Sequence, residues 1–488
     1  MRSHLKQLGS DTAIYGLSTM AGRFINYLLV PLYGRLFLTS ENGVIGLVYA
    51  AFVFLNILYT YGLESSYMKF ASGAAREKAP DTYSTVFWCL LLTSAAFTFL
   101  MLMFGKPVAQ LMTLAPEYRY AIWYMAGILF LDTMAAAPMA ELRLARRVGT
   151  FACIRLINVG LNVALNVVLI LGFHWRVEAV FFSNLVASVS TAVLSLAFTR
   201  GLWGGRFDKA LLNSMMRFGL PYVPTGIGYA VTESISRFFL ARLPEATIQQ
   251  LYGTEYTAQA VVGVYSNCCK LSVFMLLFVQ MFRSAWQPFF LQLQDEPGAH
   301  KVFARAFTLF SAIGALVVLG VSFYAHPLAM LVFGKQYPQY APGLFIVPII
   351  LLAYLAQGWY THFTAGVFIR SRTRDLPWIT LIGAVITLAA NFTLTPRYGM
   401  AAAAWATLVS YIAMAVALGI VSQRIYPVPY EWVRLAMCAG ITALAFAVGA
   451  WLSANAYASK AAILIVVVSV FLAVGLLPRL SRRAGTSG

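Results

Sequence analysis

Fourteen apolar stretches, each about the length of one bilayer crossing, constrain this chain more than any other feature. About 20 apolar residues suffice for a membrane-spanning helix, and 60% of the 488 residues are hydrophobic whereas 11% are charged. The loops between the stretches are too short to form a folded domain. The sequence therefore predicts an all-α polytopic membrane protein with about 14 transmembrane helices. The predicted spans are 12–37, 44–63, 84–104, 120–140, 150–172, 179–199, 217–241, 258–282, 304–325, 343–369, 376–395, 400–422, 434–452 and 460–477.

The seventh stretch, residues 217–242, carries ionisable residues inside its apolar length. Glu233 and Arg237 both lie there, and the stretch starts with Pro221 and Pro224, which bend or break a helix. We expect this helix to line a water-filled cavity, because a charged stripe is unstable against lipid. The residues that recur at steps of three and four, and so share one helical face, are Tyr222, Gly226, Tyr229, Glu233 and Arg237.

The net charge of +18 is explained by where the basic residues lie relative to the membrane, so it does not indicate nucleic-acid binding. With a cytoplasmic N-terminus, 23 of the 35 Lys and Arg residues fall on cytoplasmic segments and eight on the opposite side. This bias is the positive-inside rule, so both termini are predicted to lie in the cytoplasm. The basic loops are expected to contact anionic lipid headgroups. The remaining four cations lie inside spans: Arg23, Arg155, Arg237 and Lys270.

The sequence lacks the motifs of disulfide frameworks, zinc sites and ATP-binding loops. The five cysteines all lie in predicted spans without metal-ligand spacing, so neither a disulfide framework nor a zinc site is expected. Neither an H-E-x-x-H sequence nor a Walker loop occurs, so the chain is not predicted to hydrolyse ATP. We expect no cofactor and no metal, which leaves a proton or sodium gradient as a source of energy. A cleaved signal peptide is not expected, because Arg23 interrupts the first apolar run.

Short segments of the first half recur in the same order in the second half. Residues 44–49 (VIGLVY) resemble 261–265 (VVGVY), with the two glycines 217 residues apart, and 106–109 (KPVA) resembles 326–329 (HPLA) at an offset of 220. A nearly constant offset predicts two six-helix bundles related as parallel repeats, with a substrate path between them. The predicted parts are an N-terminal lobe 1–200, a cytoplasmic linker 201–212, a C-terminal lobe 213–424, and a two-helix hairpin with a cytoplasmic tail, 425–488.

These features resemble a known family. The 14 spans, the matched halves, residues 62–70 (GLESSYMKF), and the Gly263–Tyr265 segment with the later Gln287-Pro288 are similar to the polysaccharide transport family of Wzx-like oligosaccharide flippases. The larger superfamily also holds the multidrug and toxin extrusion antiporters and the lipid II flippase. The resemblance implies a transporter rather than an enzyme. It also implies a lipid-linked oligosaccharide as substrate, membrane lipids as neighbours and polysaccharide polymerase machinery as a further partner.

Ionisable and amide groups inside the spans are the candidate site residues. A charge at a helix centre costs roughly 2.5–3.5 kcal/mol on insertion scales, so such residues are expected to serve a purpose. Four buried cations face only Asp132 and Glu233, and a net positive interior suits the diphosphate of a lipid-linked sugar. The residues expected to bind substrate in the cavity are Arg23, Lys270, Arg237, Arg155, Asn26 and Asn162, and those considered for ion coupling are Glu233 and Asp132.

Each charged candidate also has a structural interpretation. Asp132 could form an ion pair with Arg23 or with Lys270, and Arg237 could pair with Glu233 or extend to the lipid headgroups. Arg155 could extend in the same way, although it shares one helical face with three asparagines. Two polar triplets could bind sugar hydroxyls or link helices. These are Tyr49, Asn56 and Thr60, and Tyr354, Gln357 and Thr361.

The leading hypothesis is a flippase that moves a lipid-linked diphosphate oligosaccharide across the bacterial cytoplasmic membrane by alternating access, for O-antigen or exopolysaccharide synthesis. Two alternatives belong to the same superfamily: an ion-coupled multidrug antiporter, which needs an acidic cavity, and a lipid II-type flippase. A third is a membrane-embedded glycosyltransferase or O-antigen ligase. That class places catalytic groups in a large external loop, and the longest one here, 243–257, shows no catalytic constellation.

Overall fold

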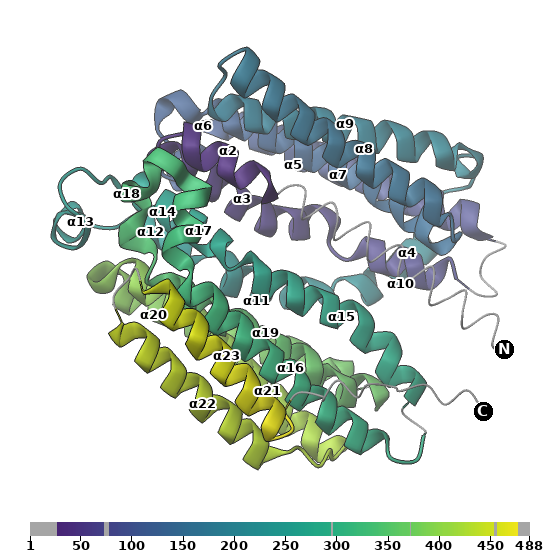
Figure 1. Ribbon diagram of the computed structural model, residues 1–488. Coiled ribbons are helices and arrows are strands. Elements are labelled where there is room, and N and C mark those ends of the chain that lie inside the picture. The colour runs from purple at the N-terminus through teal and green to yellow at the C-terminus, as the bar shows by residue number, and fades with distance from the viewer. Residues whose placement is uncertain (1–26, 73–77, 294–295, 371, 453–455, 477–488) are drawn as a thin grey trace, which may run out of the picture.

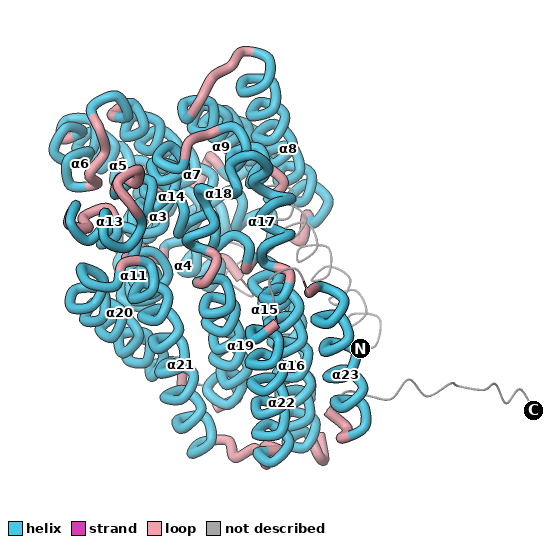
Figure 2. Tube along the Cα trace, turned by 60° about the vertical axis from the view of Figure 1, so that its left-hand side comes forward, coloured by secondary structure: helices cyan, strands magenta, loops and turns pink. Residues whose placement is uncertain are grey.

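The computed structural model describes residues 27–72, 78–293, 296–370, 372–452 and 456–476, and these contain helices but no strand. The helices form two bundles that lie against each other, as Figure 1 and the turned view of Figure 2 show. The predicted all-α class is therefore confirmed for the described part of the chain.

The first lobe consists of helices from the first 200 residues. They are α2 (Leu29–Leu36), α3 (Thr39–Thr60), α4 (Leu63–Phe70), α5 (Ala79–Met103), α6 (Gly105–Leu111), α7 (Tyr120–Leu144), α8 (Val148–Val167) and α9 (Val177–Thr199). Helix α7 packs against α5 and α9, and α9 packs against α8. Short 3-10 turns follow at Pro116–Tyr118 and Arg200–Leu202, and a π-helical turn, Val168–Gly172, ends α8.

The second lobe is built around the long helices α19 and α21, which pack against each other. Its helices are α11 (Tyr222–Ser234), α12 (Ser236–Leu240), α13 (Glu245–Tyr252), α14 (Ala258–Leu271), α15 (Val273–Leu293), α16 (Ala299–Phe323), α17 (Ala325–Phe333), α18 (Tyr337–Tyr340), α19 (Ile346–Ile369), α20 (Leu376–Tyr398) and α21 (Met400–Ile425). Its 3-10 turns are Gly334–Gln336, Ala341–Gly343 and Thr373–Asp375.

Helix α10 (Lys209–Gly219) joins the lobes. The side chain of Asp208 caps its start by accepting hydrogen bonds from the backbone N–H groups of Ala210 and Leu211. Helix α10 packs on α4 and α5 of the first lobe, where the hydroxyl of Ser66 donates to the carbonyl of Met215 (2.8 Å). The helix ends before Pro221, which has no N–H to continue it.

A terminal pair of helices, α22 (Trp432–Trp451) and α23 (Tyr457–Ala473), packs on α16. Glu431, which precedes α22, lies 3.3 Å from Arg305 of α16 and also pairs with Arg434. Burial acts to raise the pKa of Glu431, but hydrogen bonds and the two guanidinium charges outweigh it and hold that pKa below its ordinary value. This ion-pair cluster fixes the start of the hairpin to the second lobe.

The predicted number of 14 spans is not confirmed. Among the described residues, ten helices are long and apolar enough to cross a bilayer, or eleven if the bent pair α14–α15 is one span. That pair replaces the predicted eighth span and bends by 52° after Leu271. The seventh span is divided into α11 and α12 at Ile235, α23 has only 17 residues, and most of the first span lies outside the described residues.

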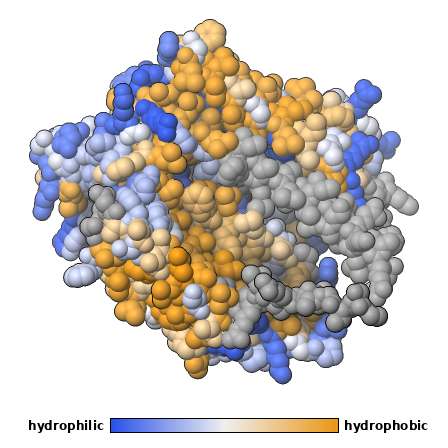
Figure 3. All heavy atoms as spheres, in the orientation of Figure 1, coloured by the Kyte–Doolittle hydropathy of each residue, from blue (hydrophilic) through white to orange (hydrophobic). Residues whose placement is uncertain are grey.

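The surface is suited to lipid. Apolar residues cover most of the length of both bundles on the face in Figure 3, and hydrophilic residues gather toward the ends. Large apolar side chains point outward along the helices; Phe392 on α20 is 74% exposed and Val433 on α22 is 75% exposed. Patches of this extent are unfavourable in water but are expected where hydrocarbon is the solvent.

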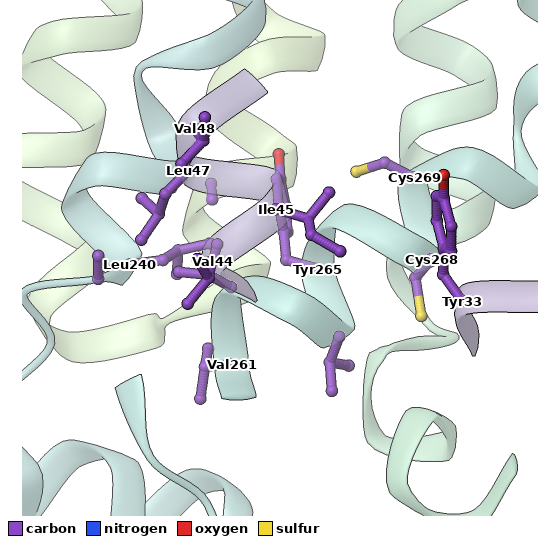
Figure 4. Close-up of a cluster of buried hydrophobic side chains, with 14 of the residues drawn as sticks. Tyr33, Val44, Ile45, Leu47, Val48, Leu240, Val261, Tyr265, Cys268 and Cys269 are labelled. Atoms are coloured by element: carbon purple, nitrogen blue, oxygen red, sulfur yellow. The ribbon is translucent and has the colours of Figure 1, made fainter. Parts of the chain in front are cut away.

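The lobes meet most closely where α3 crosses α14. We call this contact the α3–α14 seam and define it as residues 39–46 with 259–266. A Cβ atom on Gly263 would stand 1.8 Å from the carbonyl oxygen of Thr39, and one on Gly43 would stand 1.9 Å from that of Gln259. Apolar side chains from both helices gather around the crossing in Figure 4, and all belong to one buried cluster.

The seam yields a test of how the lobes are held together. Gly263→Ala should lower the free energy of unfolding by roughly 1–3 kcal/mol, because the added methyl group meets backbone rather than a movable side chain. Gly320→Ala on α16 is the matched control: a Cβ there meets nothing within 4 Å, so the helix should be unchanged or slightly more stable. Thermal unfolding in detergent compares the two, and equal midpoints would contradict close packing at the seam.

Candidate functional site

A cavity of about 440 Å³ lies between the lobes, beside the α3–α14 seam. Gly46 and Ser266 of the seam contribute to its wall, so the cavity begins where the close contact ends. Helices α2, α3, α8 and α9 line it from the first lobe, and α11, α12, α14, α15 and α19 line it from the second. Among the described residues, the polar side chains in its wall are Tyr27, Tyr33, Tyr49, Asn158, Asn162, Asn184, Glu233, Ser234, Arg237, Ser266, Lys270 and Tyr354.

Two cations face this cavity from the second lobe. Arg237 on α12 donates to the hydroxyl of Ser266 (3.3 Å) and to the backbone carbonyl of Glu233 (3.0 Å). The ammonium of Lys270 near the end of α14 donates to the side-chain oxygen of Asn267 (2.9 Å). Within the described residues, neither cation lies within 4 Å of a carboxylate oxygen. Both therefore retain donors and net charge for an anionic ligand.

Glu233 holds its carboxylate away from Arg237. One carboxylate oxygen accepts a hydrogen bond from the hydroxyl of Tyr354 on α19 (3.1 Å) and the other from Tyr411 on α21 (2.6 Å). The expected side-chain pair between Glu233 and Arg237 is not observed, because the chain breaks at Ile235 between them and the guanidinium reaches the carbonyl instead. Glu233 is thus a cavity carboxylate with two neutral donors.

The first lobe faces these charges with amides. On α8, Asn158 donates to the carbonyl of Ala187 (2.8 Å), and Asn166 donates to the side-chain oxygen of Asn162 (2.9 Å). On α9, Asn184 donates to the hydroxyl of Tyr49 (3.2 Å). These bonds orient the amides and leave uncharged polar groups, which suit hydroxyl-rich ligands, on this wall of the cavity.

The remaining candidates lie elsewhere. Asp132 on α7 lies beside Ser188 and within electrostatic range of Arg155, so the expected pairing of Asp132 with Lys270 is not found. The guanidinium of Arg155 lies over the ring of Phe151, 5.7 Å from its centre. Neither Asp132 nor Arg155 contributes to the cavity wall. Arg23 and Asn26 fall outside the described residues.

The structure brings together four of the eight predicted site residues and adds partners that the sequence did not single out. Lys270, Arg237, Asn162 and Glu233 share one cavity. Both polar triplets contribute links between helices: Tyr354 binds Glu233, Gln357 binds the hydroxyl of Tyr229, and Tyr49 binds Asn184. Asn184 and Tyr411 were missed, and only the helical spacing of Asn184 with Ser188 hinted at a polar face on that span.

A second cavity of about 540 Å³ lies between α16, α19, α21 and α22. Its wall is mainly aromatic and aliphatic, with Gln423 and Arg424 among the few polar residues. It offers a charged or sugar-bearing ligand far fewer partners than the cavity between the lobes. No group of His, Cys, Asp and Glu that could hold a metal ion is found in the described part of the chain.

The tyrosine contacts of Glu233 can be tested by removing one hydroxyl group. Tyr411→Phe should lower the free energy of unfolding by about 1–3 kcal/mol, because the half-buried carboxylate of Glu233 loses its shorter hydrogen bond. Tyr398→Phe on the exposed side of α20 is the control and should change it little. Thermal unfolding in lipid nanodiscs measures both. Equal behaviour of the two variants would mean that the hydroxyl of Tyr411 does not stabilise Glu233.

The chain was compared with protein-family models, curated sequences and solved structures. The sequence model of the family described as polysaccharide biosynthesis protein matches residues 32–342. No curated protein sequence matches the chain, whereas 31 solved chains match its structure.

The solved structures share the fold at low sequence identity. The lipid II flippase MurJ in an inward closed conformation superposes with a TM-score of 0.70 at 12% identity, covering 95% of this chain and 98% of MurJ. An inward-facing multidrug resistance MATE family transporter of the MOP superfamily has a TM-score of 0.67 at 14% identity, covering 86% of this chain and 96% of its own. A MOP superfamily transporter from Pyrococcus furiosus has a TM-score of 0.58 at 14% identity, covering 85% and 95%.

These matches confirm the resemblance that the sequence suggested. The family match spans well over half of the chain, and the structural matches span nearly all of it. The chain therefore belongs to the polysaccharide biosynthesis protein family and has the fold that MurJ and the MATE transporters share.

Proposed function

We propose that this protein is a flippase that carries a lipid-linked diphosphate oligosaccharide across a bacterial cytoplasmic membrane for surface polysaccharide synthesis. The proposal rests on one observation: Arg237 and Lys270 face a cavity between two lobes without a carboxylate partner in the described residues. Guanidinium and ammonium groups are the side chains that bind phosphate most strongly, Arg through a planar pair of donors and Lys as a point charge. The amides of α8 and α9 face them and suit sugar hydroxyls.

In this mechanism the polar head of the substrate occupies the cavity while its lipid tail stays in the bilayer. The lobes rock against each other and expose the cavity to one side and then the other, as in other transporters built from two repeats. Both termini lie in the cytoplasm, so the head enters from the linker side. The polymerase machinery that extends surface polysaccharides is the expected partner at the opposite side.

Glu233 gives the proposal a coupling site. Its carboxylate lies in the cavity wall and is held by hydroxyls rather than by a cation. A carboxylate in that setting can take up a proton or a sodium ion from an ion gradient and change the charge of the cavity. Asp132 is a second coupling candidate in the first lobe, near Arg155.

A multidrug antiporter is the second candidate, since MATE transporters share the fold. The charge of the cavity distinguishes the two functions. Cationic drugs need an acidic cavity, whereas two cations accompany one carboxylate among the described residues of this wall. For the MOP superfamily transporter from P. furiosus, the reverse polarity of the binding pocket likewise suggests a different function.

The substrate assignment can be tested in liposomes that contain a fluorescent lipid-linked diphosphate sugar. Lys270→Gln and Arg237→Gln should each slow translocation by roughly 10- to 100-fold, because each removes charge-assisted hydrogen bonds to phosphate. Lys270→Arg keeps the charge and should retain more activity than Lys270→Gln. Lys106→Gln on the exposed side of α6 is the matched control and should behave as wild type.

Wild-type translocation by both neutral variants would contradict the proposed role of the two cations. Export of a cationic dye that is abolished by Glu233→Gln but unaffected by Lys270→Gln would instead support the antiporter.

The coupling role of Glu233 predicts a different effect. Glu233→Gln should remove the acceleration that a proton or sodium gradient gives to translocation, while movement without a gradient persists. The rate is measured in the same liposomes with each gradient imposed separately. A Glu233→Gln variant that still responds fully to both gradients would exclude this carboxylate as the coupling site.

A further inference from the structure

Two arginines link the lobes reciprocally at one end of the molecule. This distal end carries α6, α13, α17 and α18 and lies opposite the linker (Figure 1). Arg35, in the last turn of α2 in the first lobe, donates to the carbonyls of Leu331 and Val332 (3.2 Å to the latter) in α17 of the second lobe. Arg242, just after α12 in the second lobe, donates to the carbonyl of Leu111 in α6 of the first lobe.

The two contacts are equivalent under the sequence duplication. The offset of 220 that relates residues 106–109 to 326–329 also relates Leu111 to Leu331, so each arginine meets the same position of the opposite repeat. Arg35 lies near the end of the first predicted span of its repeat (12–37), and Arg242 directly follows the first predicted span of the other repeat (217–241). Two contacts at equivalent positions of the two repeats indicate a functional contact between the repeats rather than two chance surface bonds.

The chemistry of these contacts favours them. The last carbonyls of a helix lack partners within the helix and carry the negative end of its dipole, so they attract a guanidinium. Leu331 and Val332 belong to the last turn of α17, and Leu111 is the last residue of α6. Both arginines are exposed at the surface, so the bonds can break without leaving a buried charge.

The arginine contacts cover closely packed parts of the lobe boundary. Next to Arg35, a Cβ atom on Gly34 would stand 2.6 Å from the ring of Phe333, so α2 lies directly against α17. Beside Leu111, the carbonyl of Thr113 accepts a hydrogen bond from Gln259 of the seam (3.0 Å). The cavity begins beside both contacts: Tyr33, two residues before Arg35, lines it, and so do Gly46 and Ser266 of the seam. Separation of the lobes at this end therefore requires both arginines to release.

We propose that Arg35 and Arg242 form a paired latch that holds the distal end closed, and that both must release before the cavity opens to that side. The latch rests on the proposed alternating access, in which the distal end is the extracellular one. It acts on the balance between closed and open states rather than on substrate, since neither arginine lines the cavity. Each arginine should favour the closed state by roughly two- to tenfold, the range expected of one hydrogen bond at the surface.

The native thiol of Cys269 reports opening, because it lines the cavity behind the seam. In proteoliposomes sorted for outward orientation of the distal end, a membrane-impermeant maleimide is added outside and the labelling of Cys269 is followed by peptide mass. Arg35→Gln and Arg242→Gln should each speed labelling by roughly two- to tenfold. The double variant should approach the product of the two effects, because the two contacts share no residue.

Arg119→Gln is the matched control, with the same loss of charge on an exposed arginine near the same end. Arg35→Lys should fall between wild type and Arg35→Gln, since a lysine can still donate one hydrogen bond. Full labelling of Cys269 after denaturation confirms that the reagent reacts, and thermal unfolding of each variant excludes global loss of structure. Labelling of the double variant at the rate of Arg119→Gln, including no labelling in either, would overturn the latch.

The labelling experiment tests the latch independently of the test of the proposed flippase function. Faster labelling without any translocation of the lipid-linked sugar would support the latch and contradict the flippase assignment. Unchanged labelling in a protein that translocates the sugar would do the reverse.

Discussion

The approach of two backbones at the α3–α14 seam is the constraint on which the rest of the structure depends. Gly43 and Gly263 allow each helix to touch a carbonyl of the other, a distance that any Cβ atom would prevent. The seam overlaps segments 44–49 and 261–265, which resemble each other, so matching parts of the two repeats lie on the two sides of the contact. The lobes therefore touch at Gly43 and Gly263, and they separate from Gly46 and Ser266 onward, where the cavity begins.

Local sequence properties predicted the parts of this fold that depend on neighbours along the chain. Hydropathy identified the helices, because lipid selects apolar runs regardless of what they pack against. Pro221 marked the start of α11, since a missing N–H acts within one turn. The stripe of Tyr229, Glu233 and Arg237 was found from spacing alone, and all three side chains contact other helices or the cavity.

Properties that depend on which helices meet could not be predicted in the same way. Tyr411 is 178 residues from Glu233, and nothing in its own span shows that its hydroxyl faces a carboxylate. Spacing at i, i+4 suggested an ion pair between Glu233 and Arg237, but a break at Ile235 changed the direction of the second side chain. Asp132 was assigned partners by charge, whereas the order of packing in the first lobe placed it near Arg155.

The electrostatics of the cavity connect the seam to the proposed transport cycle. A cation away from water is unfavourable unless an anion compensates it, and Glu233 compensates poorly because its oxygens accept from Tyr354 and Tyr411. The described residues of the wall therefore leave positive charge between the lobes. In the proposed cycle, an anionic head between Arg237 and Lys270 compensates this charge. A ligand changes an equilibrium between conformations only by binding one state better. The cations project from the second lobe and the amides from the first. In the proposed cycle, a head that reaches both walls would therefore favour the conformation in which the lobes enclose it.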